Sequence, residues 1–145
     1  MAARPQAGSY SVLLVEDDAA DAMLIEEALF EQGMARTIVK AEDGVVALEH
    51  LRENAARYPD LIILDLNMPR MNGRELLEVL KADEQLKLIP IVVLTTSAAP
   101  EDVSGAYHRH ANAYVTKPVN LDDFTRAVQS IDNFYLETAA VLARP

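Results

Sequence analysis

Five short apolar segments recur along the chain, and between them apolar residues return every three or four positions. Most of these segments are continuous runs of Val, Ile and Leu, a pattern typical of strands covered on both faces in a parallel sheet. The spacing between the segments is typical of amphipathic helices. We therefore predict strands over residues 11–15, 37–39, 61–64, 89–94 and 113–115.

Each predicted strand is followed by a predicted helix, and most of the helix starts carry a recognisable signal. Asp18 can cap the first helix, and Asp43-Gly44 and Asn72-Gly73 open the second and third. Pro100 suits the first turn of the fourth helix, where its missing N–H costs nothing, and the last helix begins near Leu121. The residues expected to face the sheet are Ala22, Ile25, Ala28, Leu29, Val45, Leu48, Leu51, Leu76, Leu77, Leu80, Leu121, Phe124, Val128, Ile131 and Tyr135.

Alternation of strands and helices predicts an α/β fold, a doubly wound five-stranded parallel sheet with right-handed crossovers. The 145 residues suit one domain, and we find no repeat or linker leading to a second one. Residues 1–9 lack an apolar core for a signal peptide and are expected to form a flexible tail. Residues 10–145 then form the domain, in which Gly33 ends the first helix and the last helix is extended.

Composition excludes several functions. The chain has no cysteine, which excludes disulfides, thiol nucleophiles and thiolate metal sites. Its net charge of −10, without a cluster of Lys and Arg, argues against nucleic acid as a direct partner. No apolar run approaches the roughly 20 residues of a membrane-spanning helix. We expect a cytoplasmic protein without membrane contact.

Polar side chains that could contribute to one chemical site follow four of the predicted strands. Glu16-Asp17 follows the first strand, Asp65 the third, Thr95 the fourth and Lys117 the fifth. Because the carboxyl ends of parallel strands line one crevice, these side chains are expected to lie close together. Three acids, a hydroxyl and a lysine suit a divalent cation beside a phosphoryl group.

Each of these residues also has an ordinary structural explanation. Glu16 and Asp17 are suited to the start of a helix, and Asp65 is suited to a turn. Lys117 alone is typical of a surface, and Thr95 alone can satisfy a neighbouring backbone group. Together, however, they supply a nucleophile, metal ligands, a cation and a hydroxyl donor, and like-charged carboxylates at one site favour a bound hard cation such as Mg²⁺.

Four motifs in register carry a family resemblance. They are Leu13–Asp18, Leu64–Pro69 with Gly73, Leu94–Ser97 and Ala113–Pro118. From about Ser11 to Ser130 the chain resembles a response-regulator receiver domain of bacterial two-component signalling. The resemblance implies the flavodoxin-like (βα)5 receiver fold with strand order 2-1-3-4-5, and a signalling module that catalyses only its own phosphorylation and dephosphorylation.

The resemblance also implies site roles. Asp65 resembles the phosphoacceptor and Asp17 the direct Mg²⁺ ligand, while Glu16 resembles the acid that holds the metal through water. The backbone carbonyl of Asn67 would supply a further ligand, and Lys117 would contact a phosphoryl oxygen. These five positions define the expected site.

The resemblance implies that two residues take part in a switch and that one peptide bond is cis. Thr95 resembles the hydroxyl that moves toward the phosphoryl group, and Tyr114 resembles the aromatic residue whose rotamer reports that movement. An ordinary half-buried tyrosine at the sheet edge explains Tyr114 equally well. The bond between Lys117 and Pro118 is expected to be cis. Phosphorylation would shift the fourth helix, fifth strand and fifth helix between two arrangements.

Three further segments resemble single-domain receivers that serve phytochrome-type histidine kinases, namely Thr95–Ala98, Ala111–Tyr114 and Asp132–Tyr135. The implied partners are a histidine kinase, a histidine phosphotransfer or effector protein, and a second copy bound through the fourth helix, fifth strand and fifth helix. Phe134 lies off the apolar stripe of the last helix, and Leu136, Val141 and Leu142 continue beyond it. That segment suits either a partner surface or a frayed tail.

Two other functions fit part of the sequence pattern. A haloacid dehalogenase-like phosphatase also uses an aspartyl nucleophile, but that pattern has a second Asp two residues later, where this chain has Asn67. A receiver-fold scaffold would bind its partner regardless of phosphorylation. The intact set of site residues disfavours this hypothesis.

Overall fold

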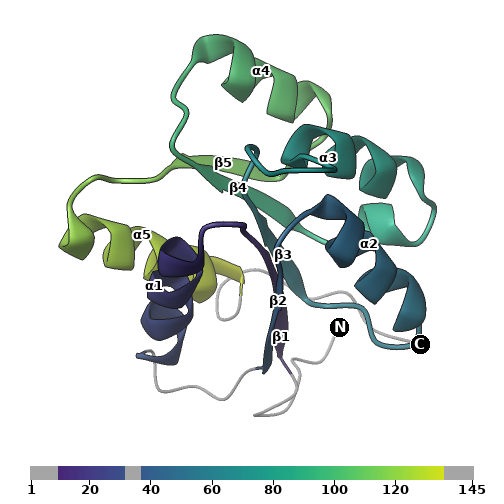
Figure 1. The fold of residues 1–145 in the computed structure, drawn as a ribbon, viewed down its shortest axis with the longest axis horizontal. Coiled ribbons are helices and arrows are strands. Elements are labelled where there is room, and N and C mark those ends of the chain that lie inside the picture. The colour runs from purple at the N-terminus through teal and green to yellow at the C-terminus, as the bar shows by residue number, and fades with distance from the viewer. Residues whose placement is uncertain (1–9, 32–36, 136–145) are drawn as a thin grey trace.

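The computed structural model describes residues 10–31 and 37–135, which form a central sheet with helices on both faces (Figure 1). The sheet has five parallel strands in the order β2-β1-β3-β4-β5. The predicted doubly wound sheet and its strand order are therefore confirmed. The predicted tail over residues 1–9, the predicted helix end at Gly33 and the chain beyond Tyr135, including Leu136, Val141 and Leu142, lie outside the described residues.

Strands and helices alternate along the described chain, with one short 3₁₀ helix between α3 and β4. The strands are β1 (Ser11–Val15), β2 (Thr37–Ala41), β3 (Leu61–Leu64), β4 (Ile91–Thr95) and β5 (Ala113–Thr116). The helices are α1 (Ala19–Phe30), α2 (Gly44–Glu53), α3 (Gly73–Ala82), η1 (Leu86–Leu88), α4 (Pro100–His108) and α5 (Leu121–Asn133).

The predicted helix starts are confirmed in detail. The Asp18 side chain accepts hydrogen bonds from the N–H groups of Ala20 and Asp21 at the start of α1. Asn72 forms a reciprocal capping box with Glu75 at the start of α3. These caps satisfy N–H groups that would otherwise lack partners, and they fix where each helix leaves the preceding loop.

Two apolar layers hold the helices to the sheet. Helices α1 and α5 pack on one face, and α2, α3 and α4 pack on the other (Figure 1). Strands β3 and β4 are buried along their whole length, as their continuous apolar sequence predicts. The site residues that follow these strands therefore start from a rigid backbone.

Several strand bounds and the burial of one residue differ from the prediction, and β2, β4 and β5 extend to Ala41, Thr95 and Thr116. Strand β4 begins at Ile91, because Pro90 has no N–H to contribute to the ladder, although its carbonyl accepts a hydrogen bond from Ile62. Leu121 was expected in the core, but it is the first residue of α5 and is 56% exposed. Among the described residues, no helix has both the length and the apolar character to cross a membrane.

Candidate functional site

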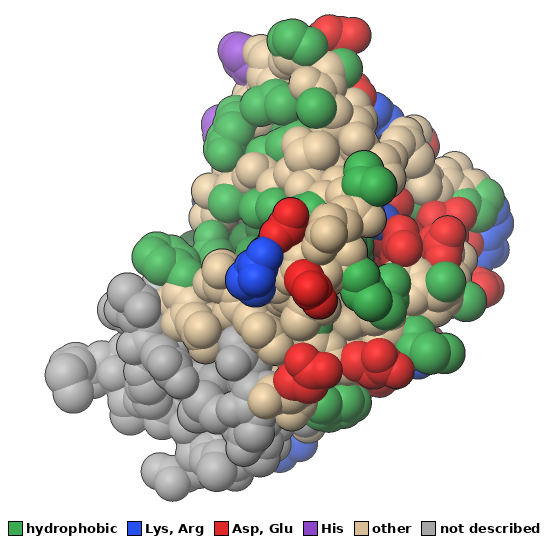
Figure 2. Space-filling view, turned by 90° about the vertical axis from the view of Figure 1, so that its left-hand side faces the viewer, with side chains coloured by type: hydrophobic (Ala, Val, Ile, Leu, Met, Phe, Trp, Pro, Cys, Tyr) green, Lys and Arg blue, Asp and Glu red, His purple; other side chains and the backbone are tan. Residues whose placement is uncertain are grey.

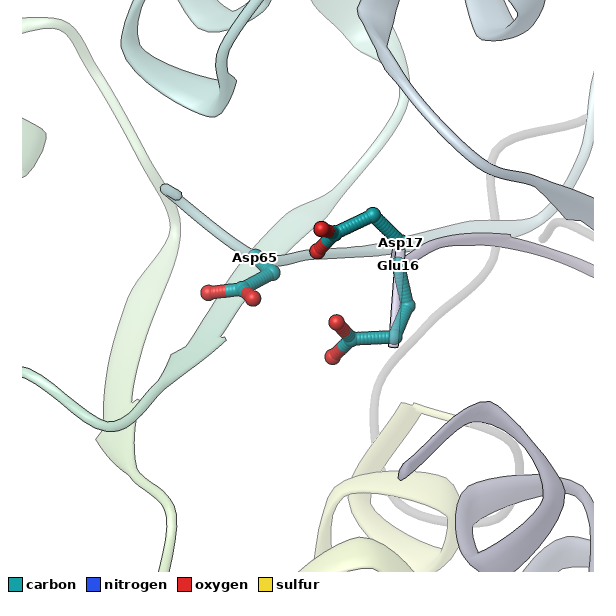
Figure 3. A group of neighbouring side chains, drawn as sticks. All are labelled: Glu16, Asp17 and Asp65. Carbon is teal, nitrogen blue, oxygen red and sulfur yellow. The ribbon is translucent and has the colours of Figure 1, made fainter. Parts of the chain in front are cut away.

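Three carboxylates meet at the carboxyl edge of the sheet. Val15 of β1 is paired with Leu64 of β3, so the residues that follow, Glu16 and Asp65, leave the sheet side by side. The Asp65 N–H donates to the Val15 carbonyl over 3.0 Å, which fixes this arrangement. One carboxylate oxygen from each of Glu16, Asp17 and Asp65 lies within 4.8 Å of the others (Figure 3). The expected acidic cluster is present.

The surroundings of these acids fit a divalent cation. Glu16 and Asp65 are buried, whereas Asp17 is exposed and leaves the cluster open to solvent. Within the described chain the buried Asp65 Oδ1 atom has no hydrogen-bond partner, an arrangement that is costly for a carboxylate oxygen. All the available donors are oxygen atoms, which hard cations such as Mg²⁺ prefer. A cation at this point would give Asp65 Oδ1 a partner and would reduce the repulsion among the three carboxylates.

Lys117 joins the cluster from the end of β5. Its backbone N–H donates to the Thr95 carbonyl over 2.7 Å, and its side chain is buried. Its Nζ donates to Glu16 over 2.5 Å and to Asp21 over 2.8 Å, but lies 3.6 Å from Asp65 Oδ2. The lysine is thus hydrogen-bonded to Glu16, which follows β1, and to Asp21, which lies in α1. It is close to Asp65 but makes no hydrogen bond to it.

The pKa values of this group reflect burial and mutual charge. Burial raises the pKa of Glu16 to about 7, and repulsion from Asp65 adds to the rise, while the hydrogen bond from Lys117 opposes it. Burial also opposes the charged form of Lys117, but the hydrogen bonds to Asp21 and Glu16 outweigh it and raise its pKa. Lys117 therefore stays protonated at neutral pH, and its positive charge stabilises the carboxylates of Glu16 and Asp21.

Thr95 and Tyr114 lie on the two strands beyond Asp65. Thr95 ends β4, is fully buried, and its hydroxyl has no hydrogen-bond partner among the described residues. Tyr114 is half-buried on the edge strand β5, and its hydroxyl donates to the Ser97 carbonyl over 2.7 Å. This bond links β5 to the loop that follows Thr95. The proposed movements of both residues stay predictions.

One expectation about the site is wrong. There is no cis peptide bond in the described part of the chain, so Lys117–Pro118 is trans. The trans isomer is the one that X-Pro bonds ordinarily favour, by about 0.5–1 kcal/mol, and Lys117 makes its backbone and side-chain hydrogen bonds with this isomer in place. Asn67 is exposed directly after the Asp65-Leu66 pair, and the role of its carbonyl as a ligand stays a prediction.

Asp21 is a site residue that sequence reasoning missed. It lies in the first turn of α1, where acidic residues are common because they favour the positive end of the helix dipole. That position gave no reason to distinguish it from an ordinary helix-start acid. Only the fold reveals that the end of β5 brings Lys117 within 2.8 Å of it.

Comparison with known proteins gives consistent results. The family model of the response regulator receiver domain matches residues 12–129. Response regulator Rcp1 from Synechocystis sp. is 43% identical over 137 residues, covering 91% of this chain and 92% of Rcp1. The probable methanogenesis regulatory protein FilR2 from Methanothrix harundinacea is 41% identical over 130 residues, covering 88% of this chain and 84% of FilR2.

Solved structures agree with these sequence matches. The Mn²⁺-bound form of Rcp1 superposes with a TM-score of 0.85 at 40% identity, covering 92% of this chain and 99% of that chain. The phosphorylated cyanobacterial phytochrome response regulator RcpA superposes with a TM-score of 0.87 at 42% identity, with the same coverage. The family match includes all four strand ends that carry the acids, Thr95 and Lys117.

Proposed function

The chain belongs to the response regulator receiver family, and we propose that it is a stand-alone response regulator that accepts a phosphoryl group on Asp65. The observation that carries this proposal is the cluster at the sheet edge. An Asp65 carboxylate oxygen lies within 4.8 Å of one from each of two other acids, and Asp65 Oδ2 is 3.6 Å from the Nζ of a buried lysine. The other oxygen, Oδ1, has no hydrogen-bond partner among the described residues.

The proposed reaction is a displacement at phosphorus. An oxygen of the ionised Asp65 carboxylate attacks the phosphorus of a phosphohistidine or a small phosphodonor. The new P–O bond forms as the bond to the leaving nitrogen or oxygen breaks, and the leaving group keeps the electron pair. The product is an aspartyl phosphate, and hydrolysis later returns the carboxylate and releases inorganic phosphate.

Several residues would support this transfer. Glu16, Asp17, Asp65 and the Asn67 carbonyl would hold Mg²⁺, which supplies positive charge beside the transferring phosphoryl group. Lys117 would donate to a phosphoryl oxygen from its buried position, and the Thr95 hydroxyl would donate to another. The buried Thr95 hydroxyl, which has no hydrogen-bond partner within the described part of the chain, supports that assignment because such a group gains a partner when an acceptor arrives. Two similar solved structures add support, since one is the Mn²⁺-bound form of Rcp1 and the other is phosphorylated RcpA.

The proposed partner is a histidine kinase of the phytochrome type. RcpA is described as a cyanobacterial phytochrome response regulator, and it is 42% identical to this chain. Phosphorylation would then change the surface formed by α4, β5 and α5, which we call the switch face. That face would bind an effector, a histidine phosphotransfer protein or a second copy of the chain.

The test is the intact mass of the protein after incubation with a small phosphodonor. We expect one phosphoryl adduct that requires Mg²⁺ and is absent from Asp65→Asn. An adduct that persists in Asp65→Asn would contradict the assignment of the acceptor. Absence of any adduct in the wild type, with partner binding unchanged by the donor, would favour a phosphorylation-independent scaffold. Continuous hydrolysis of phosphate esters in bulk would instead favour a phosphatase.

A further inference from the structure

The Lys117 ammonium donates hydrogen bonds to Glu16 and Asp21, which restrain its position. We propose that Asp21 is the residue that positions it. Asp21 holds the Lys117 ammonium toward α1, away from Asp65, and thereby slows phosphorylation of Asp65. This inference rests on the proposed function and concerns the same site.

The hydrogen bonds of Lys117 show the restraint. An ammonium has three donors, and two of them go to Glu16 over 2.5 Å and Asp21 over 2.8 Å. The distance to Asp65 Oδ2 is 3.6 Å, which is too long for a hydrogen bond. At the same time the other oxygen of Asp65 has no partner among the residues described. The lysine therefore lies nearest to the acids that are not expected to be phosphorylated.

Asp21 is the acid that can release Lys117 most cheaply. Its side chain is 29% exposed, whereas that of Glu16 is only 2% exposed. When the lysine turns to a new anion on Asp65, water can therefore solvate the carboxylate of Asp21, which the positive end of α1 also favours. Glu16 has no such access and remains with the lysine and the metal. The bond to Asp21 is thus the one that breaks as phosphorylation proceeds.

Breaking this bond adds to the barrier for the transfer. The transferring phosphoryl group is anionic and needs the ammonium, so the attraction between Asp21 and Lys117 is lost during the reaction. The carboxylate of Asp21 also repels the incoming phosphodonor. Replacing it by Asn keeps the shape and a weaker hydrogen-bond acceptor but removes the charge. Phosphorylation should consequently become faster.

The experiment compares phosphorylation rates at saturating Mg²⁺ with a small phosphodonor, measured by intact mass over time. We expect Asp21→Asn to raise the rate constant about fivefold, the change expected when a charged hydrogen bond becomes a neutral one. Asp21→Glu, which restores the charge, should remain within about twofold of the wild type. The matched control is Glu26→Gln, because Glu26 lies on the same helix, is 26% exposed and pairs with Lys40 outside the site.

The outcomes separate this inference from the proposed function. Absence of Asp65-dependent phosphorylation in the wild type would overturn both. If the wild type is phosphorylated but Asp21→Asn reacts at the same rate or more slowly, only the role of Asp21 is overturned. A similar acceleration in Glu26→Gln would show a general effect of net charge and would also overturn it. Thermal unfolding should stay cooperative in each variant, with at most a small decrease in Asp21→Asn from the lost ion pair, which excludes a folding defect as the cause.

Discussion

Gly73 lies against the backbone of the proposed phosphoacceptor. Its N–H donates to the Leu66 carbonyl over 2.9 Å, and a Cβ atom at this position would lie 2.2 Å from the Asp65 carbonyl oxygen and 2.7 Å from the Leu66 Cα. Both neighbours are backbone atoms of the segment that carries the site, so neither can move aside without shifting Asp65. The absence of a side chain at Gly73 is therefore part of how the site is built.

Gly73→Ala should destabilise the protein and misplace Asp65. We expect a loss of about 2 kcal/mol in the free energy of unfolding, the usual cost of overpacking, and slower phosphorylation at the same Mg²⁺ concentration. Chemical denaturation and the mass assay measure the two effects. Gly105→Ala is the control, because its Cβ would meet only the flexible end of the Arg109 side chain. Equal stability of the two variants would contradict the close approach at Gly73.

Most of the site residues could be predicted because they follow strands. Glu16, Asp17, Asp65 and Lys117 each come directly after an apolar run, and a parallel sheet places all such positions at one edge. Asp21 could not be predicted in this way, because its partner lies 96 residues away and no periodic pattern links them. The isomer of the bond before Pro118 likewise depends on tertiary packing.

Hydrogen bonds connect the loop after β3 to the turn before α2. Asp43 caps α2 through the Val46 N–H and also accepts a 2.7 Å hydrogen bond from Arg70, while the Gly44 N–H donates to the Met71 carbonyl over 2.9 Å. Arg70 has a φ of 58°, a conformation that costs a non-glycine residue about 1 kcal/mol or more. The ion pair with Asp43 offsets this strain and holds the loop that follows the proposed phosphoacceptor.

This connection predicts a pH dependence. Burial opposes the charged form of Asp43, but hydrogen bonds from Arg70 and the Val46 N–H outweigh it, so the pKa of Asp43 lies below its ordinary value. The stabilisation is therefore complete above the pKa of the unfolded chain and is lost as the pH falls through the lower pKa of the folded protein. Asp43→Asn, which can still cap α2, should cost about 1 kcal/mol of unfolding free energy at neutral pH and progressively less in acid. A difference that stays constant down to about pH 2 would contradict this account.

The order and faces of the elements were predictable, whereas some ends were not. Continuous apolar runs identified β3 and β4 because both are buried on each side. Strand β4 begins after Pro90, later than predicted. Leu121 is exposed, because helical spacing alone does not show where a helix first contacts the sheet. Periodicity specifies which side of a helix is apolar, and the extent of the sheet decides how much of it is covered.

Over the whole chain acidic residues outnumber basic ones, and several large apolar side chains of the described residues are exposed. The net charge is −10, and acidic side chains lie at several positions on the face shown in Figure 2. Tyr107 of α4 and Phe134 at the end of α5 are 48% and 51% exposed. The predicted exposure of Phe134 is confirmed, and both aromatic residues belong to the helices of the switch face.

These aromatic residues predict an effect on self-association. If the switch face binds a second copy, phosphorylation should increase the dimer fraction in sedimentation velocity, and Phe134→Ala should weaken the dimer about tenfold, as loss of a central aromatic contact does. Phe30→Ala is the matched control, because Phe30 is 55% exposed but lies on α1. A dimer equally sensitive to both variants, or a monomer in every state, would contradict the proposed interface.

The identity of the kinase, the input signal and the downstream target depend on the surfaces of other molecules. A sequence predicts its own fold through periodicity and its own chemistry through strand ends, because both arise within one chain. The complementarity that selects a partner is distributed over two chains. The proposal of a phytochrome-type partner accordingly rests on resemblance to RcpA.

The most direct test of the account is to locate the phosphoryl group. Borohydride reduces an aspartyl phosphate to homoserine, so treatment after phosphorylation in Mg²⁺, followed by trypsin and fragment mass analysis, identifies the modified residue. We expect homoserine at position 65, within the peptide spanning residues 58–70, and none at Asp60 in the same peptide. Homoserine at Asp60, Asp17 or any other position, or no reduced residue in a phosphorylated sample, would contradict it.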